Sequence, residues 1–182
     1  SLTRQHHGEQ PFWAGTALAA MLGQIGLPGT GVGYGYSAVN NVGQHAVHLP
    51  WTPMDRLKNP VSSFIPVARI ADLLLKPGET FDFNGEQHTY PDIKMVCWAG
   101  GNPFHHHQDL NRLVEAWRRP ETIVVNEPWW NAMARHCDIV LPATTPLERT
   151  DVIAPGRGDF AVVSKKAVEP FGEARNDHDI FA

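Results

Sequence analysis

The sequence predicts the α/β class, as a Rossmann-like three-layer domain with a mainly parallel sheet. Apolar strand-like runs and helix-like stretches alternate along the second half, with strands at 93–100, 122–127 and 138–143 and helices at 108–119 and 129–137. Such runs, expected to be buried on both faces, are typical of parallel strands joined by crossover helices. A further apolar run at 160–168 is predicted to be another strand.

A helix is predicted at residues 9–25, with Pro11 in its first turn and a stop at Gly26. The absence of charged residues along most of it predicts burial on most sides. Residues 29–63 are rich in glycine and proline, and a loop of this length predicts a binding or capping role. The "GTGVGYG" stretch follows a helix, whereas a phosphate-binding loop follows a strand, so it is predicted to be a turn.

A second helix is predicted at 66–76, starting at Pro66, and a hairpin at 80–90 around Asn84-Gly85, the preferred pair for a type I′ turn. The whole chain is predicted to be one domain. Residues 1–65 form its helix and long-loop segment, and residues 66–182 form its βαβ core.

Composition excludes several classes of function. The 182 residues include 42% hydrophobic and 19% charged residues, and the net charge is −4 without a basic block, which gives nucleic-acid binding little support. No apolar run reaches the length of a membrane span. The two cysteines, Cys97 and Cys137, lie in apolar runs and are expected to be buried, reduced thiols. The chain lacks an initiator Met and stops within a helix-like stretch, so we expect a piece of a longer polypeptide.

Distinctive groups follow the three predicted parallel strands: Gly100-Gly101-Asn102-Pro103, then Asn126-Glu127-Pro128, then Glu148 and Arg149 beyond Pro142. Ligands of open α/β sheets bind beyond the carboxyl ends of the strands. Glycines allow close approach of a phosphate or sugar, and an acid at the second strand end can bind ribose hydroxyls. A nucleotide pocket is therefore predicted. The alternative is that these residues form only turns and helix caps, and the G-x-G-x-x-G spacing is absent.

The triple histidine His105–His107 does not predict a metal site, because adjacent side chains point in different directions and no spaced partner is present. Contacts of these rings to a ligand phosphate or to neighbouring carbonyl groups are the favoured interpretation. No serine–histidine–aspartate or paired-carboxylate pattern is present. No catalytic residue is therefore assigned.

Several motifs together resemble the molybdopterin oxidoreductases: "RQHHGEQPFW", "LAAMLGQIGLPG", "WAGGNPFHHHQDLNRL", "ARHCDIVLPATTPLER" and "EARNDHDIF". The resemblance extends over nearly the whole chain. It is strongest to the branch of dimethyl sulfoxide, trimethylamine N-oxide and biotin sulfoxide reductases, and most of all to the biotin sulfoxide reductase-like members.

The resemblance implies a molybdenum ion held by two molybdopterin guanine dinucleotides, each bound by one Rossmann-like domain. This chain is similar to the later of those two domains. The cofactor-binding positions carried over by the resemblance, together with the glycine turn, are Ser1, Gln5, Gly101, Asn102, Asn126, Glu127, Arg149 and Asp177. No residue matches the metal ligand of the family, so no metal-binding residue is assigned.

The implied function is that of the cofactor-binding domain of an S-oxide or N-oxide reductase. Its partners would be the remaining domains of the parent enzyme and a small S-oxide or N-oxide substrate, and the isolated chain would be inactive. A carboxylate can accept both N–H groups of the guanine edge, and either Asp177 or Glu127 can fill this role, with the other on ribose hydroxyls. The alternatives are a generic nucleotide-binding module without a redox role and a non-catalytic interaction fragment.

Overall fold

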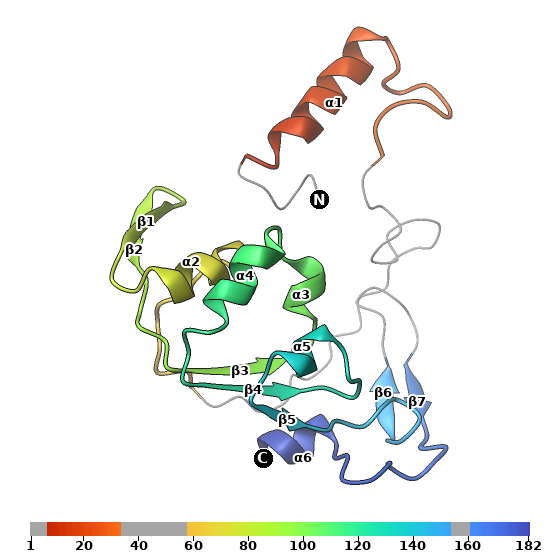
Figure 1. The fold of residues 1–182 in the computed structure, drawn as a ribbon. Helices are drawn as coiled ribbons and strands as arrows, with labels where there is room; N and C mark the ends of the chain where they lie inside the picture. The colour runs from red at the N-terminus through yellow and green to blue at the C-terminus, as the bar shows by residue number, and fades with distance from the viewer. Residues whose placement is uncertain (1–6, 34–57, 154–160) are drawn as a thin grey trace. The chain divides into compact units, whose positions relative to one another are not determined.

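The computed structural model describes residues 7–33, 58–153 and 161–182 (Figure 1). The chain divides into two compact units. One consists of residues 1–58 and 151–164, and the other of residues 59–150 and 165–182. The second unit contains the predicted strand–helix core. Most of the predicted long loop, residues 34–57, lies outside the described residues, so its binding or capping role stays a prediction.

Three parallel strands form the sheet of the second unit, in the order β3–β4–β5. They span Met95–Ala99, Thr122–Asn126 and Ile139–Leu141. The register pairs Ala99 with Asn126, and Asn126 with Leu141. The last residues of all three strands therefore lie side by side at one edge of the sheet. The α/β class and the parallel pairing of these three runs are confirmed.

Helices cover one face of this sheet (Figure 1). α3 (Pro103–His106) and α4 (Leu110–Ala116) connect β3 to β4, and α5 (Ala132–Arg135) connects β4 to β5. Right-handed crossovers between strands added in one direction place their helices on the same face. Each helix begins where a side-chain oxygen accepts a backbone N–H of the first turn, at Asn102, Asp109 and Asn131. The two helices predicted at 108–119 and 129–137 are confirmed in shortened form.

The core lies between these helices and the sheet. Leu113 and Met133 are fully buried, and Ile123 and Val125 of β4 are nearly so. α2 (Ile70–Leu75), which follows a 3₁₀ turn at Val67–Arg69, adds Ala71 and Leu74. An ion pair between Asp72 of α2 and Arg112 of α4 joins the two helices. The predicted helix at 66–76 is therefore confirmed, and it belongs to the layer of helices on the sheet.

The opposite face of the sheet is open. Side chains alternate along β3, so that Val96 and Trp98 pack against the core whereas Met95 and Cys97 are exposed. Ile139 of β5 is also exposed. The prediction that the strands are buried on both faces is wrong for this chain, because all the described crossovers lie on one side. Both cysteines are free thiols, but Cys97 is exposed rather than buried, because its position in β3 points away from the helices.

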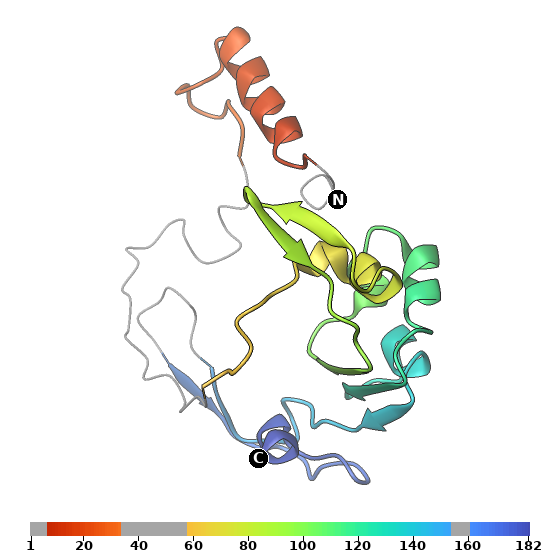
Figure 2. The same cartoon turned by 90° about the vertical axis from the view of Figure 1, so that its left-hand side faces the viewer.

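The predicted hairpin is formed by β1 (Thr80–Phe83) and β2 (Glu86–Thr89), which pair antiparallel. Figure 2 shows it as a ribbon of its own beside α2. Asn84 and Gly85 have φ values of 53° and 81°, as both central residues of a type I′ turn require. The sequence signature of the turn therefore sets the hairpin register.

α1 spans Gln10–Met21, with Pro11 in its first turn as predicted. It ends before the predicted stop, because Gly23 adopts a positive φ and the N–H groups of Gly23 and Gln24 return to the carbonyls of Ala20 and Ala19. The prediction that α1 is buried on most sides is wrong for this chain. Ala19 is its one buried residue. In the described ranges, no helix has both the length and the apolar character needed to cross a membrane.

The run at 160–168 does not join the parallel sheet. Only Val162–Ser164 forms a strand, β7, which pairs antiparallel with β6 (Asp151–Ile153). The connection between these two short strands is too short for a parallel crossover, which needs about a dozen residues or more. Both strands belong to the first unit. The prediction of a further strand is confirmed for three residues, and this strand lies outside the parallel sheet.

Replacing Leu113 with alanine should destabilise the second unit by about 2–5 kcal/mol, because it leaves a cavity between α4 and β4. Chemical denaturation followed by tryptophan fluorescence measures this, since Trp98 and Trp117 lie in or against the core. Leu110 lies on the same helix but is exposed, so Leu110→Ala is the matched control and should cost about 0.5 kcal/mol or less. Equal losses for both variants would contradict the described core.

Candidate nucleotide pocket

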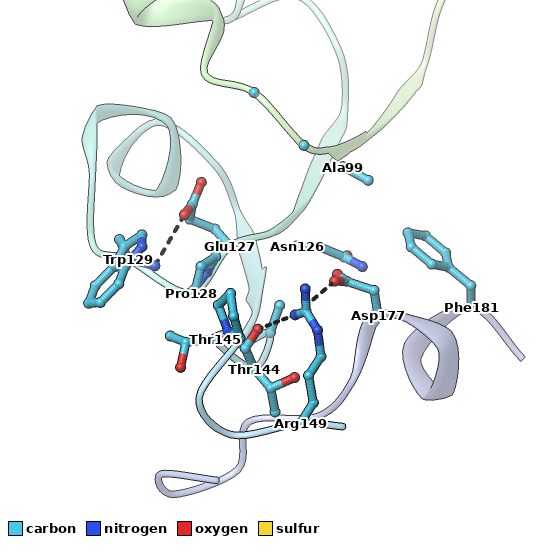
Figure 3. Close-up of a pocket in the computed structure, with 14 residues that line it drawn as sticks. Ala99, Asn126, Glu127, Pro128, Trp129, Thr144, Thr145, Arg149, Asp177 and Phe181 are labelled. Atoms are coloured by element: carbon cyan, nitrogen blue, oxygen red, sulfur yellow. Dashed lines mark hydrogen bonds and ion pairs between the residues drawn. The ribbon is translucent and has the colours of Figure 1, made fainter. Parts of the chain in front are cut away.

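A pocket of about 490 Å³ lies at the carboxyl edge of the parallel sheet (Figure 3). The loops that follow β3, β4 and β5 line it, together with α6 (Asp177–Phe181). Its lining residues are 99–101, 126–129, 143–146, 149, 177 and 181. This is the position at which open α/β sheets bind their ligands. A pocket is therefore present at the strand ends of the second unit, and a nucleotide as its ligand stays a prediction.

The glycine turn forms one side of the pocket. Gly100 and Gly101 have φ values of 72° and 70°, which other residues adopt only with strain. Their carbonyl oxygens accept a shared hydrogen bond from the Trp98 indole, at 2.9 and 3.2 Å from Nε1. The turn is therefore held by a side chain that packs against the core, and it presents bare backbone to the pocket.

Asn102 follows this turn but does not line the pocket. Its side-chain oxygen accepts the Phe104 N–H at 3.0 Å, and its carbonyl oxygen accepts the His105 N–H at 2.9 Å. Both contacts start α3. The interpretation of this residue as a helix cap is thus supported, and its contact with a cofactor stays a prediction.

Asn126 is the last residue of β4 and contributes an unsatisfied donor. Its Nδ2 atom is buried and has no hydrogen-bond partner among the described residues. A buried polar group without a partner costs about 1–3 kcal/mol, and native structures retain few of them. Because Asn126 lines the pocket, a ligand oxygen bound there can accept this hydrogen bond.

Glu127 turns toward its own loop. Its Oε1 atom accepts the backbone N–H of Trp129 at 3.2 Å, and its own N–H donates to the Leu141 carbonyl at 3.2 Å. In Figure 3 its carboxylate points away from that of Asp177. The sequence alone leaves the roles of Asp177 and Glu127 interchangeable. In the structure these two acids face different parts of the pocket.

The loop after β5 positions α6. A parallel bridge between Ala143 and Arg175 continues the sheet beyond β5. Thr144, which is almost fully buried, donates its N–H to the Arg175 carbonyl and its hydroxyl to the Asn176 side chain, both at 2.9 Å. These bonds place Asp177, the first residue of α6, at the pocket.

Arg149 brings positive charge to the same place. One guanidinium nitrogen donates to the Thr144 carbonyl at 2.6 Å and lies 3.7 Å from a carboxylate oxygen of Asp177. Figure 3 shows the guanidinium extending from below toward Asp177. A guanidinium in this setting can also bind a phosphate oxygen.

The position of Glu148 beyond the third strand predicts that it is available to a ligand. In the structure both of its carboxylate oxygens are already bound within the protein. One of its carboxylate oxygens accepts the N–H and the hydroxyl of Thr145, both at 2.8 Å, and the other accepts the Phe171 N–H at 2.8 Å. The Thr145 backbone N–H, then the hydroxyl and the Phe171 N–H, hold the pKa of the Glu148 carboxyl below its usual value. The expectation fails because this carboxylate closes the loop that carries Arg149.

The triple histidine lies outside the pocket lining. His105 and His106 are exposed on α3. Among the described residues, no group of three or more histidines, cysteines and acids is arranged to hold a metal ion. The expected contact of these rings with a ligand stays a prediction.

Comparison with known proteins decides the family. The family model described as molybdopterin oxidoreductase matches residues 1–182, the whole chain. The chain belongs to this family. Membership of this family implies a molybdenum-pterin cofactor.

Three relatives illustrate the similarity. The chain is 56% identical to a biotin sulfoxide reductase of Cereibacter sphaeroides over all of its own length and 24% of the relative's. It is 45% identical to a dimethyl sulfoxide/trimethylamine N-oxide reductase of the same organism, again over all of the chain and 24% of the relative. It is 47% identical to a trimethylamine-N-oxide reductase of Haemophilus influenzae over 99% of the chain and 23% of the relative. The chain thus spans about a quarter of the length of these relatives.

The structure of this chain gathers most of the predicted site residues. Five predicted residues line one pocket: Gly101, Asn126, Glu127, Arg149 and Asp177. Ser1 and Gln5 lie outside the described residues, so their cofactor contacts stay predictions. Sequence reasoning missed Thr144 and Phe181. Phe181 follows Asp177 by four residues, a spacing that marks one helix face and could have indicated it.

Replacing Glu148 with glutamine should lower the unfolding temperature at neutral pH. The folded-state pKa of Glu148 is depressed, so its carboxylate adds stability above the ordinary glutamate pKa of about 4.3. That stability is lost as the pH falls through the lower folded-state pKa. The difference between wild type and variant, followed by thermal unfolding, should therefore shrink as the pH falls below about 4. The exposed Glu173→Gln is the control, and a difference that persists unchanged in acid would contradict this role.

Proposed function

We propose that this chain is the cofactor-binding part of a larger molybdenum-dependent enzyme that reduces S-oxides or N-oxides. The observation behind the proposal is the similarity over the whole chain to biotin sulfoxide, dimethyl sulfoxide and trimethylamine N-oxide reductases. Because the chain spans about a quarter of these relatives, the remaining domains are its partners, and the substrate is a small S-oxide or N-oxide.

The cofactor form that we propose is bis(molybdopterin guanine dinucleotide) molybdenum, with the nucleotide end of one dinucleotide in the pocket at the sheet edge. Three features of the pocket fit such a ligand. Asn126 has a buried donor without a partner, Arg149 supplies a positive charge, and the glycine turn presents bare backbone. The volume of about 490 Å³ lies in the range of small-molecule sites.

The acids of the pocket provide base selectivity in this proposal. Guanine presents two adjacent N–H groups that one carboxylate can accept, whereas adenine has no such pair. Asp177 and Glu127 are the carboxylates that line the pocket. When bound, the cofactor supplies the two-electron redox chemistry, and this chain supplies position and charge. No catalytic residue is assigned to the chain, and alone it is expected to be inactive.

The Rossmann-like three-layer fold is also part of the proposal. Parallel sheets are covered on both faces in nearly all proteins. Here Met95 and Ile139 leave one face apolar and exposed, at 55% and 47% of their surface. In the complete enzyme, segments outside this chain would cover that face and supply the third layer.

The full-length protein should contain molybdenum, an oxidisable pterin and guanosine monophosphate released by acid hydrolysis. Replacing Asp177 with asparagine should lower the guanosine monophosphate and pterin content about tenfold, since the amide replaces one acceptor of the guanine pair with a donor. Metal analysis, pterin fluorescence and chromatography of the released nucleotide measure this.

Asp179→Asn is the matched control, because Asp179 lies on the same helix but lines a different pocket. Its cofactor content should equal that of the wild type. Release of adenosine monophosphate instead would favour the generic nucleotide-binding module, and absence of metal, pterin and nucleotide from the wild type would refute the proposed function.

A further inference from the structure

Phe181 is a large apolar side chain exposed at a polar pocket. It ends α6 and lines the pocket, yet 64% of its surface is accessible. Figure 3 places its ring at the same side of the pocket as the side chains of Asn126 and Asp177. The ring therefore offers an uncovered π face next to a carboxylate and an unsatisfied amide donor.

Helical spacing makes the ring and the carboxylate a pair. Asp177 and Phe181 are four residues apart on α6, so both project from the same face of the helix. The helix begins at Asn176, whose carbonyl accepts the N–H groups of Asp179 and Ile180 at 3.0 and 3.1 Å. The Thr144 hydroxyl fixes the Asn176 side chain as well. The pair is therefore held by the body of the second unit.

The other acid of the pocket also has an aromatic neighbour, since Trp129 lines the pocket and is 66% exposed. Glu127 has one carboxylate oxygen on the Trp129 N–H and points away from Asp177. A planar base needs a donor–acceptor partner at its edge and an apolar partner on its face. Both sides of the pocket therefore offer a carboxylate and a ring. The α6 side adds the unsatisfied Asn126 donor, whereas the Glu127 carboxylate already accepts the Trp129 N–H.

We propose that Phe181 is the stacking platform for the base of the bound nucleotide, with Asp177 accepting the N–H groups at the base edge. This assigns the base to the α6 side of the pocket and leaves Glu127 for the sugar hydroxyls. The inference rests on the proposed function, since it specifies how the same pocket holds a guanine nucleotide.

The test uses full-length protein produced without cofactor, titrated with labelled GMP and with AMP in equilibrium dialysis. Stacking does not discriminate strongly between bases, so Phe181→Leu should weaken binding of both nucleotides by about tenfold. Phe181→Tyr keeps the ring and should stay within about twofold of the wild type. Asp177→Asn should weaken GMP binding and leave AMP binding unchanged.

Phe171→Leu is the matched control, because Phe171 is 89% exposed and does not line the pocket. It should bind both nucleotides like the wild type. Three results would overturn the role of Phe181 as a stacking platform. They are GMP binding by Phe181→Leu equal to that of Phe171→Leu, an equal loss of binding in Phe181→Leu and Phe181→Tyr, and an absence of GMP binding by the wild type.

The failure of this inference is distinguishable from the failure of the proposed function. Cofactor-loaded wild type that contains molybdenum, pterin and guanosine monophosphate supports the proposed function whatever the Phe181 variants do. In that loaded protein, Phe181→Leu should also lose its pterin about tenfold faster on dilution than Phe181→Tyr. Equal rates of loss would count against the platform alone.

Discussion

The parallel pairing of β3, β4 and β5 in chain order is the constraint on which the pocket depends. Because the strands run in one direction, every loop that follows a strand begins at the same edge. The glycine turn, Asn126 and the loop of Thr144 thus come together although they lie far apart in the sequence. The bridge from Ala143 to Arg175 extends this order by one step and brings α6 to the same edge. The parallel strand order therefore brings polar groups from four segments of the chain to one pocket.

The polar residues around this edge divide into two sets. Asn102, Glu148 and Thr144 satisfy backbone groups or side chains of the protein, and their bonds shape the loops. Asn126 and Asp177 keep hydrogen-bonding capacity toward the pocket, and Arg149 holds its charge beside them. An unsatisfied buried donor such as Asn126 Nδ2 lowers the stability of the protein by about 1–3 kcal/mol. A ligand oxygen that accepts its hydrogen bond removes this penalty. Stability and ligand affinity are thus supported by different residues of one loop cluster.

Sequence patterns predict the elements whose cause is local. The Asn84-Gly85 turn and the apolar runs of β3, β4 and β5 are of this kind, and the strand-end position of Gly101, Asn126 and Glu127 follows from the same pattern. Local sequence patterns do not predict properties that depend on long-range packing. The exposure of Met95, the antiparallel partner of β7 and the bonds of Glu148 to Thr145 and Phe171 each require knowledge of what lies opposite in space.

The most direct test of the account is an experimental structure of the cofactor-loaded, full-length protein. The account predicts density for a guanine nucleotide beyond the carboxyl ends of β3, β4 and β5, with Asn126 Nδ2 donating to it and Arg149 beside its charged groups. Side chains of another domain filling this pocket, with both nucleotides bound elsewhere, would contradict the account.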